Sequence, residues 1–282
     1  MKTRHLILSA ILFLSVAPVH AQTLKPLPKL LPVREQQAVR ESWLKKRLET
    51  MLLPMMRQQK IEMWIVTNEE FHADPVTEYI APPLPYVGRR DFFIFADRGG
   101  DKLDRIAMVR YTEEHLKNFF EVLNPPGREI AATLRRIVDE RKPKTIALNM
   151  GGTRGATNGI THDTYRFLTE TLGTEYSSRF VSAAPLIVEY MDTRIPEELE
   201  HYRTAVEVTD LLTQRAFSNE VITPGKTTVG DVRWWFMQQV NNLGLSVWFQ
   251  PDLRVQRQNK KPVRRSSFSV SRKNRWSSSE AM

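Results

Sequence analysis

Glu197, Glu198, Glu200 and His201 form the densest group of side chains in this sequence that could do chemistry. Carboxylates and an imidazole within about one helical turn are donors that a divalent metal accepts. Only Glu197 and Glu198 stand a turn before His201, so only these two could share its helix face. Acidic residues are also expected in a first helical turn because of the helix dipole. Since a metal needs further donors, we interpret the group as a helix start rather than a metal site.

A glycine-rich segment at 151–159 follows a predicted strand and precedes a predicted helix, where phosphates bind in many proteins. It has neither the Gly-Lys-Ser/Thr end of a P-loop nor the G-x-G-x-x-G spacing. We therefore interpret it as a flexible connector, in which glycine supplies backbone freedom. His162 and Asp163 follow directly and suggest a metal dyad, but they lack further donors. We expect Thr161 or Asp163 to cap the next helix ahead of Thr164.

The sequence lacks residues or motifs that other classes of catalysis need. The sequence has no cysteine, which excludes disulfides, thiolate catalysis, Cys-ligated zinc and a lipidated N-terminal cysteine. It has no Gly-x-Ser-x-Gly elbow, so no motif supports a Ser-His-Asp triad. Beyond residue 21 the only histidines are His72, His115, His162 and His201.

The segment 254–282 differs in composition from the rest of the chain. It holds nine Lys or Arg against one acid, Glu280, and carries +8 of the formal net charge of +9. Seven serines and no hydrophobic period predict a disordered basic tail without a core. Such a tail attracts polyanions, and Phe268 and Trp276 could stack on bases, but we expect no specific nucleic-acid recognition.

The N-terminus has the pattern of an export signal. Lys2 and Arg4 precede a short apolar run, and small residues lead to a predicted cleavage point after Ala21. The run is too short to anchor the chain, so we expect a signal peptide at 1–21, a periplasmic or secreted protein, and no membrane association after cleavage. Three prolines at 22–33 predict an extended leader. Residues 22–253 then carry a net charge of −1, from +9 − 8 − 2.

The elements between 34 and 192 alternate between helical and strand patterns. Apolar residues at helical spacing predict a long helix from about Glu35, which Pro54 should kink or end. Apolar runs rich in β-formers predict strands at 63–67, 91–96, 106–111 and 145–150, with a hairpin turn at 98–101. Further helices are predicted at 129–140 and 163–172. This order predicts an α/β domain with a mixed sheet flanked by helices.

Two long helices are predicted to follow, in place of the alternating helices and strands. The first starts at Pro196, and its expected apolar face is Leu199, Tyr202, Val206, Leu212 and Ala216. The second starts at a capping box, in which Thr228 accepts from the Asp231 amide. It is expected to bury Val232, Trp235, Phe236, Val240 and Leu243, and residues 245–249 are expected to start a strand.

Three segments resemble known proteins. Residues 47–68 (RLETMLLPMMRQQKIEMWIVTN) resemble the opening of creatinase-type N-terminal domains. Residues 185–210 (PLIVEYMDTRIPEELEHYRTAVEVTD) are similar to the junction at which Xaa-Pro aminopeptidases and prolidases enter their "pita-bread" catalytic domain, and 222–231 resemble its second helix. The resemblance runs from about Arg34 to Phe249. It implies a creatinase-like domain at 34–192 and the start of a pita-bread α+β domain at 193–253.

The resemblance also implies a chemistry: hydrolysis of the peptide bond before proline in proline-containing peptides. Intact relatives hold two divalent metals (Mn, Co or Zn) with two aspartates, a histidine and two glutamates, all beyond the two matched helices. Here no histidine follows His201, and after Asp252 the only acid is Glu280. We therefore assign no catalytic, cofactor-binding or metal residue, and expect no cofactor in this chain.

The combined expectation is an exported, C-terminally truncated and inactive relative of these metallopeptidases, with a reading-frame change near residues 259–260. A smaller departure from the family is Ile195, which stands where a serine often caps the following helix. Two alternatives stay open: a non-enzymatic module that binds a partner or forms a homodimer through its N-terminal domain, and a protein that binds polyanions through its tail.

Overall fold

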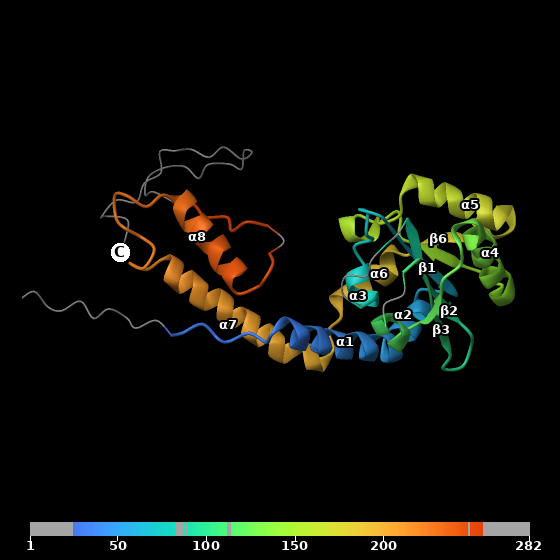
Figure 1. Cartoon of the computed structure of the whole chain (residues 1–282), viewed down its shortest axis with the longest axis horizontal. Helices are drawn as coiled ribbons and strands as arrows, with labels where there is room; N and C mark the ends of the chain where they lie inside the picture. The colour runs from blue at the N-terminus through green and yellow to red at the C-terminus, as the bar shows by residue number, and fades with distance from the viewer. Residues whose placement is uncertain (1–24, 83–86, 88, 112–113, 248, 256–282) are drawn as a thin grey trace, which may run out of the picture. The chain divides into compact units, whose positions relative to one another are not determined.

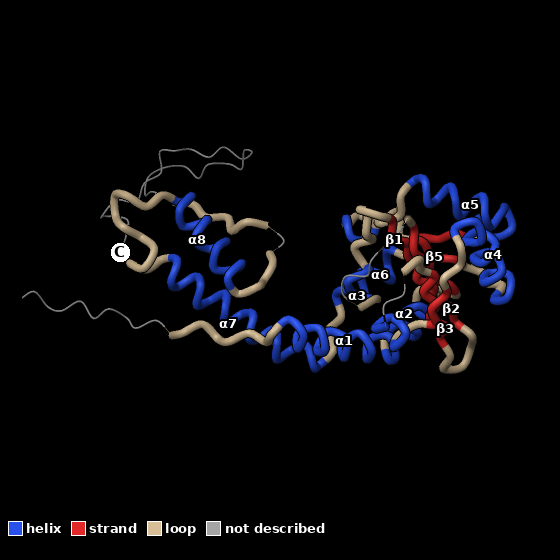
Figure 2. Tube along the Cα trace, in the orientation of Figure 1, coloured by secondary structure: helices blue, strands red, loops and turns tan. Residues whose placement is uncertain are grey.

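The computed structural model describes residues 25–82, 87, 89–111, 114–247 and 249–255. These residues form two compact units (Figures 1 and 2). The N-terminal unit is Leu30–Arg203, and the C-terminal unit is 204–255 together with 25–29. The predicted signal peptide at 1–21 and residues 256–282 of the basic tail lie outside the described residues.

A six-stranded mixed sheet organises the described part of the N-terminal unit, in the order β4-β3-β2-β1-β5-β6. The β1–β2 and β2–β3 pairs are antiparallel, whereas β1–β5, β5–β6 and β3–β4 are parallel. The mixed α/β sheet predicted from the sequence is thereby confirmed. The strands are β1 (Met63–Glu69), β2 (Arg90–Asp97), β3 (Leu103–Met108), β4 (Glu121–Leu123), β5 (Ile146–Leu148) and β6 (Phe180–Ser182).

Helices cover both faces of this sheet, with α4 and α5 on one side and α2, α3 and α6 on the other (Figure 1). Two 3₁₀ turns matter below, η2 (Gly127–Glu129) and η4 (Pro196–Glu198). The helices are α1 (Val33–Thr50), α2 (Leu52–Gln58), α3 (Thr77–Ile80), α4 (Ile130–Arg141), α5 (His162–Ser177) and α6 (Ala184–Asp192).

The central strand β1 is buried on both faces because each face has its own helical cover. Trp64 and Val66 enter the core formed with α1, α2 and α6, whereas Met63 and Ile65 enter the core formed with α4 and α5. Successive side chains of a strand point to opposite faces, so a strand between two cores must be apolar throughout. This explains the continuous apolar run that predicted β1.

Local signals in the sequence set several element boundaries. Pro54 has no N–H for the carbonyl of Thr50, and the long predicted helix breaks at Met51 into α1 and α2. The Arg98 amide donates to the Lys102 carbonyl at 2.9 Å and closes the β2–β3 hairpin where it was predicted. Gly173, with φ 65° and ψ 176°, breaks α5, which resumes as far as Ser177.

The C-terminal unit is built on α7 (Leu199–Ala216), whose first turn belongs to the N-terminal unit, and α8 (Val229–Asn242). The predicted capping box is confirmed: the Thr228 hydroxyl accepts from the Asp231 amide at 3.2 Å. A small core forms around Ala216, Ile222 and Val232. Of the stripe predicted for α8, Val232 and Val240 are buried, while Trp235, Phe236 and Leu243 are half-buried.

The apolar face predicted for α7 is wrong in its first half. Leu199, Tyr202 and Val206 are exposed, and the buried face starts at Val208 and includes Leu212 and Ala216. A helix turns by about 100° per residue, so the six residues from Val206 to Leu212 turn it by about 240°. The predicted stripe therefore joined two different faces of the helix.

Other strand assignments also need correction. The strand predicted at 106–111 begins earlier, at Leu103, and ends at Met108. The three-residue strands β4 and β6 were not predicted, because so short a segment shows no periodicity. Residues 245–247 and 249, where a strand was expected to start, are not in a strand. No helix among the described residues combines the length and the hydropathy that crossing a membrane requires.

Candidate functional site

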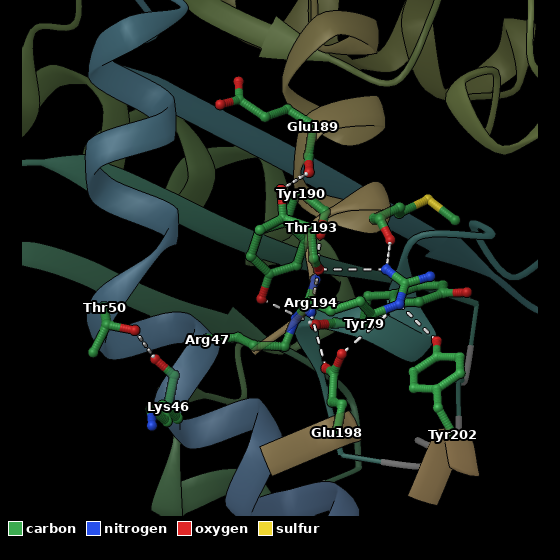
Figure 3. Close-up of polar contacts among 11 residues, drawn as sticks. Lys46, Arg47, Thr50, Tyr79, Glu189, Tyr190, Thr193, Arg194, Glu198 and Tyr202 are labelled. Atoms are coloured by element: carbon green, nitrogen blue, oxygen red, sulfur yellow. Dashed lines mark hydrogen bonds and ion pairs between the residues drawn. The ribbon is translucent and has the colours of Figure 1, made fainter. Parts of the chain in front are cut away.

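A cluster of polar side chains gathers where α1 meets the end of α6 and the start of η4 (Figure 3). Its centre is an ion pair between Arg47 of α1 and Glu198 of η4, with 3.0 Å between Nη1 and Oε1. Arg47 is 5% exposed and Glu198 is 6% exposed, so the pair is withdrawn from water. The stem of Arg47 reaches this place because Leu44 and Leu48 fix the same side of α1 to the core.

The guanidinium groups of the cluster also complete the end of α6. Arg47 donates to the carbonyl oxygens of Tyr190 and Thr193, the second at 2.9 Å. Arg194 donates to the Met191 carbonyl and, at 2.6 Å, to the Tyr202 hydroxyl. The last carbonyls of a helix have no partner within the helix, and cations are favoured there by the helix dipole. The cluster thus joins α1, α6 and η4, because the charged side chains and the last carbonyls of α6 supply hydrogen-bond partners to one another.

Tyr190 lies beneath the Arg47 guanidinium, with 4.5 Å from Cζ to the ring centroid. Its hydroxyl donates to the Tyr79 carbonyl at 3.2 Å. Burial raises the pKa of Tyr190 to about 12, although the positive charge of Arg47 acts in the opposite direction. At neutral pH this phenol is therefore a neutral hydrogen-bond donor, not a base.

In the structure, the members of the Glu197–His201 group contact different partners. Glu197 pairs with Lys46 and Glu198 with Arg47, while the His201 ring packs edge-on against Trp43 with 5.0 Å between centroids. The hydrogen bond from Lys46 lowers the pKa of Glu197. The structure does not bring the two carboxylates and the imidazole together, which agrees with the helix-start interpretation. The same contacts tie η4 and the first turn of α7 to the N-terminal unit, which extends to Arg203.

The glycine-rich loop at 151–159 is packed rather than open. The Asn158 side chain donates to the Gly152 carbonyl at 2.7 Å and accepts from the Gly152 amide at 3.2 Å. A Cβ on Gly152 would lie 1.7 Å from the Thr157 hydroxyl, and one on Gly159 would lie 1.9 Å from Asp74 Oδ2. The segment is a connector, as predicted, but at these two positions glycine is needed for close packing. Backbone freedom is the reason only at Gly151, where φ is +77°.

Beneath this loop lies a buried polar cluster that the sequence did not reveal. Trp64 Nε1 donates to Asn149 Oδ1 at 2.7 Å, and Asn149 Nδ2 donates to Asp74 Oδ2 at 2.6 Å. The Asp74 amide donates to Asn68 Oδ1 at 2.8 Å. Burial raises the pKa of Asp74 to about 6, against the hydrogen bonds from the Val76 amide and Asn149. Asn68 lies near the end of β1, and Asn149 directly follows the parallel strand β5. Polar residues at the ends of two buried strands were the available signal.

His162 and Asp163 begin α5, and Thr161 is the cap. The Thr161 hydroxyl accepts from the Thr164 amide at 3.0 Å, which confirms one of the two predicted caps. Asp163 instead pairs with Arg90 at 3.0 Å and with Arg166 at 2.7 Å. The hydrogen bond from Arg90 lowers the pKa of Asp163, so it is a carboxylate engaged by two cations.

Several carboxylates of the C-terminal unit have local partners among the described residues. Asp231 is the acceptor of the α8 capping box, and its pKa is lowered by the Thr228 amide. Asp210 accepts from Gln214, Glu220 lies 3.9 Å from Arg215, and Asp252 pairs with Arg254 at 2.6 Å. Across the described ranges, no three His, Cys, Asp or Glu side chains are placed to hold a metal ion together.

Comparison with solved structures identifies the fold. An aminopeptidase P structure from Bacillus anthracis matches with a TM-score of 0.54 and 10% identity, over 73% of this chain and 52% of that one. An X-Pro aminopeptidase from Thermotoga maritima matches with a TM-score of 0.49 and 18% identity, over 67% and 49% of the two chains. A Xaa-Pro dipeptidase from Bacillus anthracis matches with a TM-score of 0.44 and 16% identity, over 71% and 49%. The chain has a creatinase/prolidase-like fold.

The comparisons also set the extent of this likeness. The chain spans about half the length of the first two solved structures that it matches, 49% in each case. No protein-family model matches the sequence, and no curated protein matches it significantly. The likeness is therefore one of fold, as expected from the segments at 47–68 and 185–210.

Proposed function

We propose that this protein is a relative of the Xaa-Pro aminopeptidases that does not itself cleave peptides. The observation that carries the relationship is the fold, with its likeness to an aminopeptidase P over 73% of the chain at a TM-score of 0.54. Two segments that resemble the family form consecutive elements of the structure. Residues 47–68 run from the end of α1 through α2 into β1, and 185–210 form α6, η4 and most of α7.

The absence of catalysis is supported by what the acidic side chains do. Hydrolysis in this class needs two cations that lower the pKa of a shared water and polarise the scissile carbonyl. The carboxylates described in the C-terminal unit instead cap a helix or pair with neighbouring basic and amide groups. In the sequence no histidine follows His201, and Glu280 is the only acid after Asp252.

The test is a peptidase assay on the full chain with Mn²⁺, Co²⁺ or Zn²⁺ and an Xaa-Pro peptide, paired with elemental analysis. We expect no release of the N-terminal residue and no stoichiometric metal after dialysis. Two tightly held ions per chain, with turnover that a chelator removes, would refute the proposal. An experimental structure tests the relationship separately, because a strand order other than β4-β3-β2-β1-β5-β6 would remove its basis.

A second candidate is a non-enzymatic binding module, with a second copy of this chain as the partner. It is favoured by large apolar side chains that are exposed on or near α7 and α8, namely Val206, Phe217, Trp234 and Phe249. Exposed apolar surface of this kind marks interaction sites in many soluble proteins. Light scattering across a concentration series measures the oligomeric state, and a monomer at all concentrations would exclude self-association. A dimer formed through these residues or through the N-terminal unit should be unchanged when 254–282 is deleted.

Two proposals concern the ends of the sequence. Residues 1–21 would direct export to the periplasm or the exterior, and N-terminal sequencing of the secreted protein should begin at Gln22. The segment 254–282, with nine basic residues against one acid, would bind polyanions without sequence preference. Deleting it should abolish retention on heparin, whereas unchanged retention would refute this role.

A further inference from the structure

A cleft with a volume of about 520 Å³ opens at one edge of the sheet in the N-terminal unit. Arginines Arg89, Arg90 and Arg110 line it together with apolar side chains that include Met108, Ile130 and Phe167. Nothing in the proposed function uses this cleft. Its volume is in the range of pockets that hold small organic molecules, roughly 300–1,000 Å³.

The sheet topology explains why these side chains meet. β3 and β4 are parallel, so their carboxyl ends lie at the same edge of the sheet, and antiparallel β2 begins there. Phe92 pairs with Met108, so Arg90 and Arg110, each two residues nearer the edge, lie on the face of Phe92 and Met108. That face is the one covered by α4 and α5.

Arg90 is a structural member of the cleft wall. Its Nη2 lies 3.3 Å from Glu69 Oε1 and 3.0 Å from Asp163 Oδ2, and its Cζ lies 4.7 Å from the centroid of Phe167. Two carboxylates thus neutralise this guanidinium and hold it in place. Arg90 fixes the aromatic wall but has little charge left for a ligand.

Arg89 and Arg110 differ from Arg90. Both are exposed, and the described residues give neither of them a carboxylate partner. Asp91, which follows Arg90 in the sequence, is buried, and its Oδ1 accepts from the Arg110 amide at 3.1 Å. The Arg110 guanidinium itself lies 5.8 Å from the centroid of the Tyr111 ring. Within the described ranges, the cleft therefore presents two guanidinium groups that are not paired with a carboxylate, beside an apolar wall.

The chain also places the start of a helix at this edge. Residues Asn124, Pro125, Pro126 and Gly127 line the cleft and lead through η2 into the 12-residue α4. The start of a helix attracts negative charge because of the helix dipole. Pro125 and Pro126 have no backbone N–H, so they cannot hydrogen-bond to a strand at this edge of the sheet. This adds to the positive potential that the two arginines produce.

We propose that this cleft binds a small organic anion, a carboxylate or phosphate group carried on an apolar or aromatic body. Guanidinium groups bind planar or tetrahedral oxyanions through paired N–H donors, and these bonds are among the strongest in proteins. The oxyanion lies on Arg89 and Arg110, and the apolar body lies against Met108, Ile130 and Phe167. The inference does not depend on whether the chain is related to peptidases.

The test is calorimetric titration of the full chain with phenyl phosphate, benzoate and inorganic phosphate. We expect phenyl phosphate or benzoate to bind, and the double variant R89Q/R110Q to weaken that binding by about tenfold or more. The control R98Q/R136Q removes the same charge from two exposed arginines outside the cleft and should bind as the parent does. The basic segment 254–282 is present in all variants, so its contribution cancels.

The outcomes separate the parts of the proposal. Binding of phenyl phosphate alone assigns a phosphate ligand, and binding of benzoate alone assigns a carboxylate, and either supports the site. F167L should weaken phenyl phosphate more than inorganic phosphate, because only the former uses the apolar wall. If no probe binds, or if R89Q/R110Q binds like the control, the site is refuted. If inorganic phosphate binds as tightly as phenyl phosphate, the organic ligand class is refuted.

Discussion

Replacing Arg47 with methionine should destabilise the N-terminal unit by about 3–5 kcal/mol, the usual cost of removing one partner of a buried ion pair. The variant leaves the Glu198 carboxylate, 6% exposed, without its cation. It also removes the donor to the Tyr190 and Thr193 carbonyls at the end of α6. Methionine keeps most of the apolar stem, so lost packing contributes little.

The readout is urea-dependent amide hydrogen exchange of peptides from β1 and β2, because these strands form the centre of the N-terminal unit. The matched control is K46M, which breaks the neighbouring Lys46–Glu197 pair, where both side chains are nearly half exposed. Solvent screening should leave K46M close to the parent. The double variant R47M/E198M removes both buried charges and should be more stable than R47M alone.

Equal stability of R47M and K46M would refute the reasoning. It would mean that removing the buried cation Arg47 costs no more free energy of unfolding than removing the exposed cation Lys46. A double variant no more stable than R47M would also contradict it. In that case the cost would come from the lost hydrogen bonds at the end of α6, not from an uncompensated charge.

Three further predictions concern single positions. Burial raises the pKa of Asp91 to about 6, so ionisation weakens the fold as pH rises from about 4 to 7. In D91N the free energy of unfolding should therefore fall less between pH 4 and 7, by up to roughly 3 kcal/mol, as measured by unfolding experiments across this range. If D91N has the same pH dependence as the parent, the pKa of Asp91 is not raised. G159A should cost about 1–3 kcal/mol because its Cβ would meet buried Asp74, whereas G155A, with open space around its Cβ, should be neutral. T228A removes the cap of α8 and should cost about 1 kcal/mol, measured by exchange of α8 amides; faster exchange in β1 instead would show that the two units unfold together.

Much of the fold could be predicted because its signals are local. The apolar run of β1, the turn at 98–101, Pro54 and the Thr228 cap each act through neighbours within a few residues, so the sequence displays them directly. The short strands β4 and β6 could not be predicted, because three residues become a strand only when a neighbouring strand supplies the hydrogen bonds. The buried face of α7 was misassigned because the predicted residues span two faces of the helix, and the sequence does not show which of these faces is covered.

The candidate sites divide in the same way. The sequence by itself determined the absence of cysteine, the scarcity of histidine and the basic segment 254–282, and so the absence of thiol and disulfide chemistry from the sequence. Only the tertiary structure decided that Glu197 and Glu198 pair with α1, 151 residues away in each case, and that Arg89 and Arg110 line one cleft. The physical reason is that residue type fixes which interactions a side chain can make, whereas its burial and its partners depend on how distant segments pack.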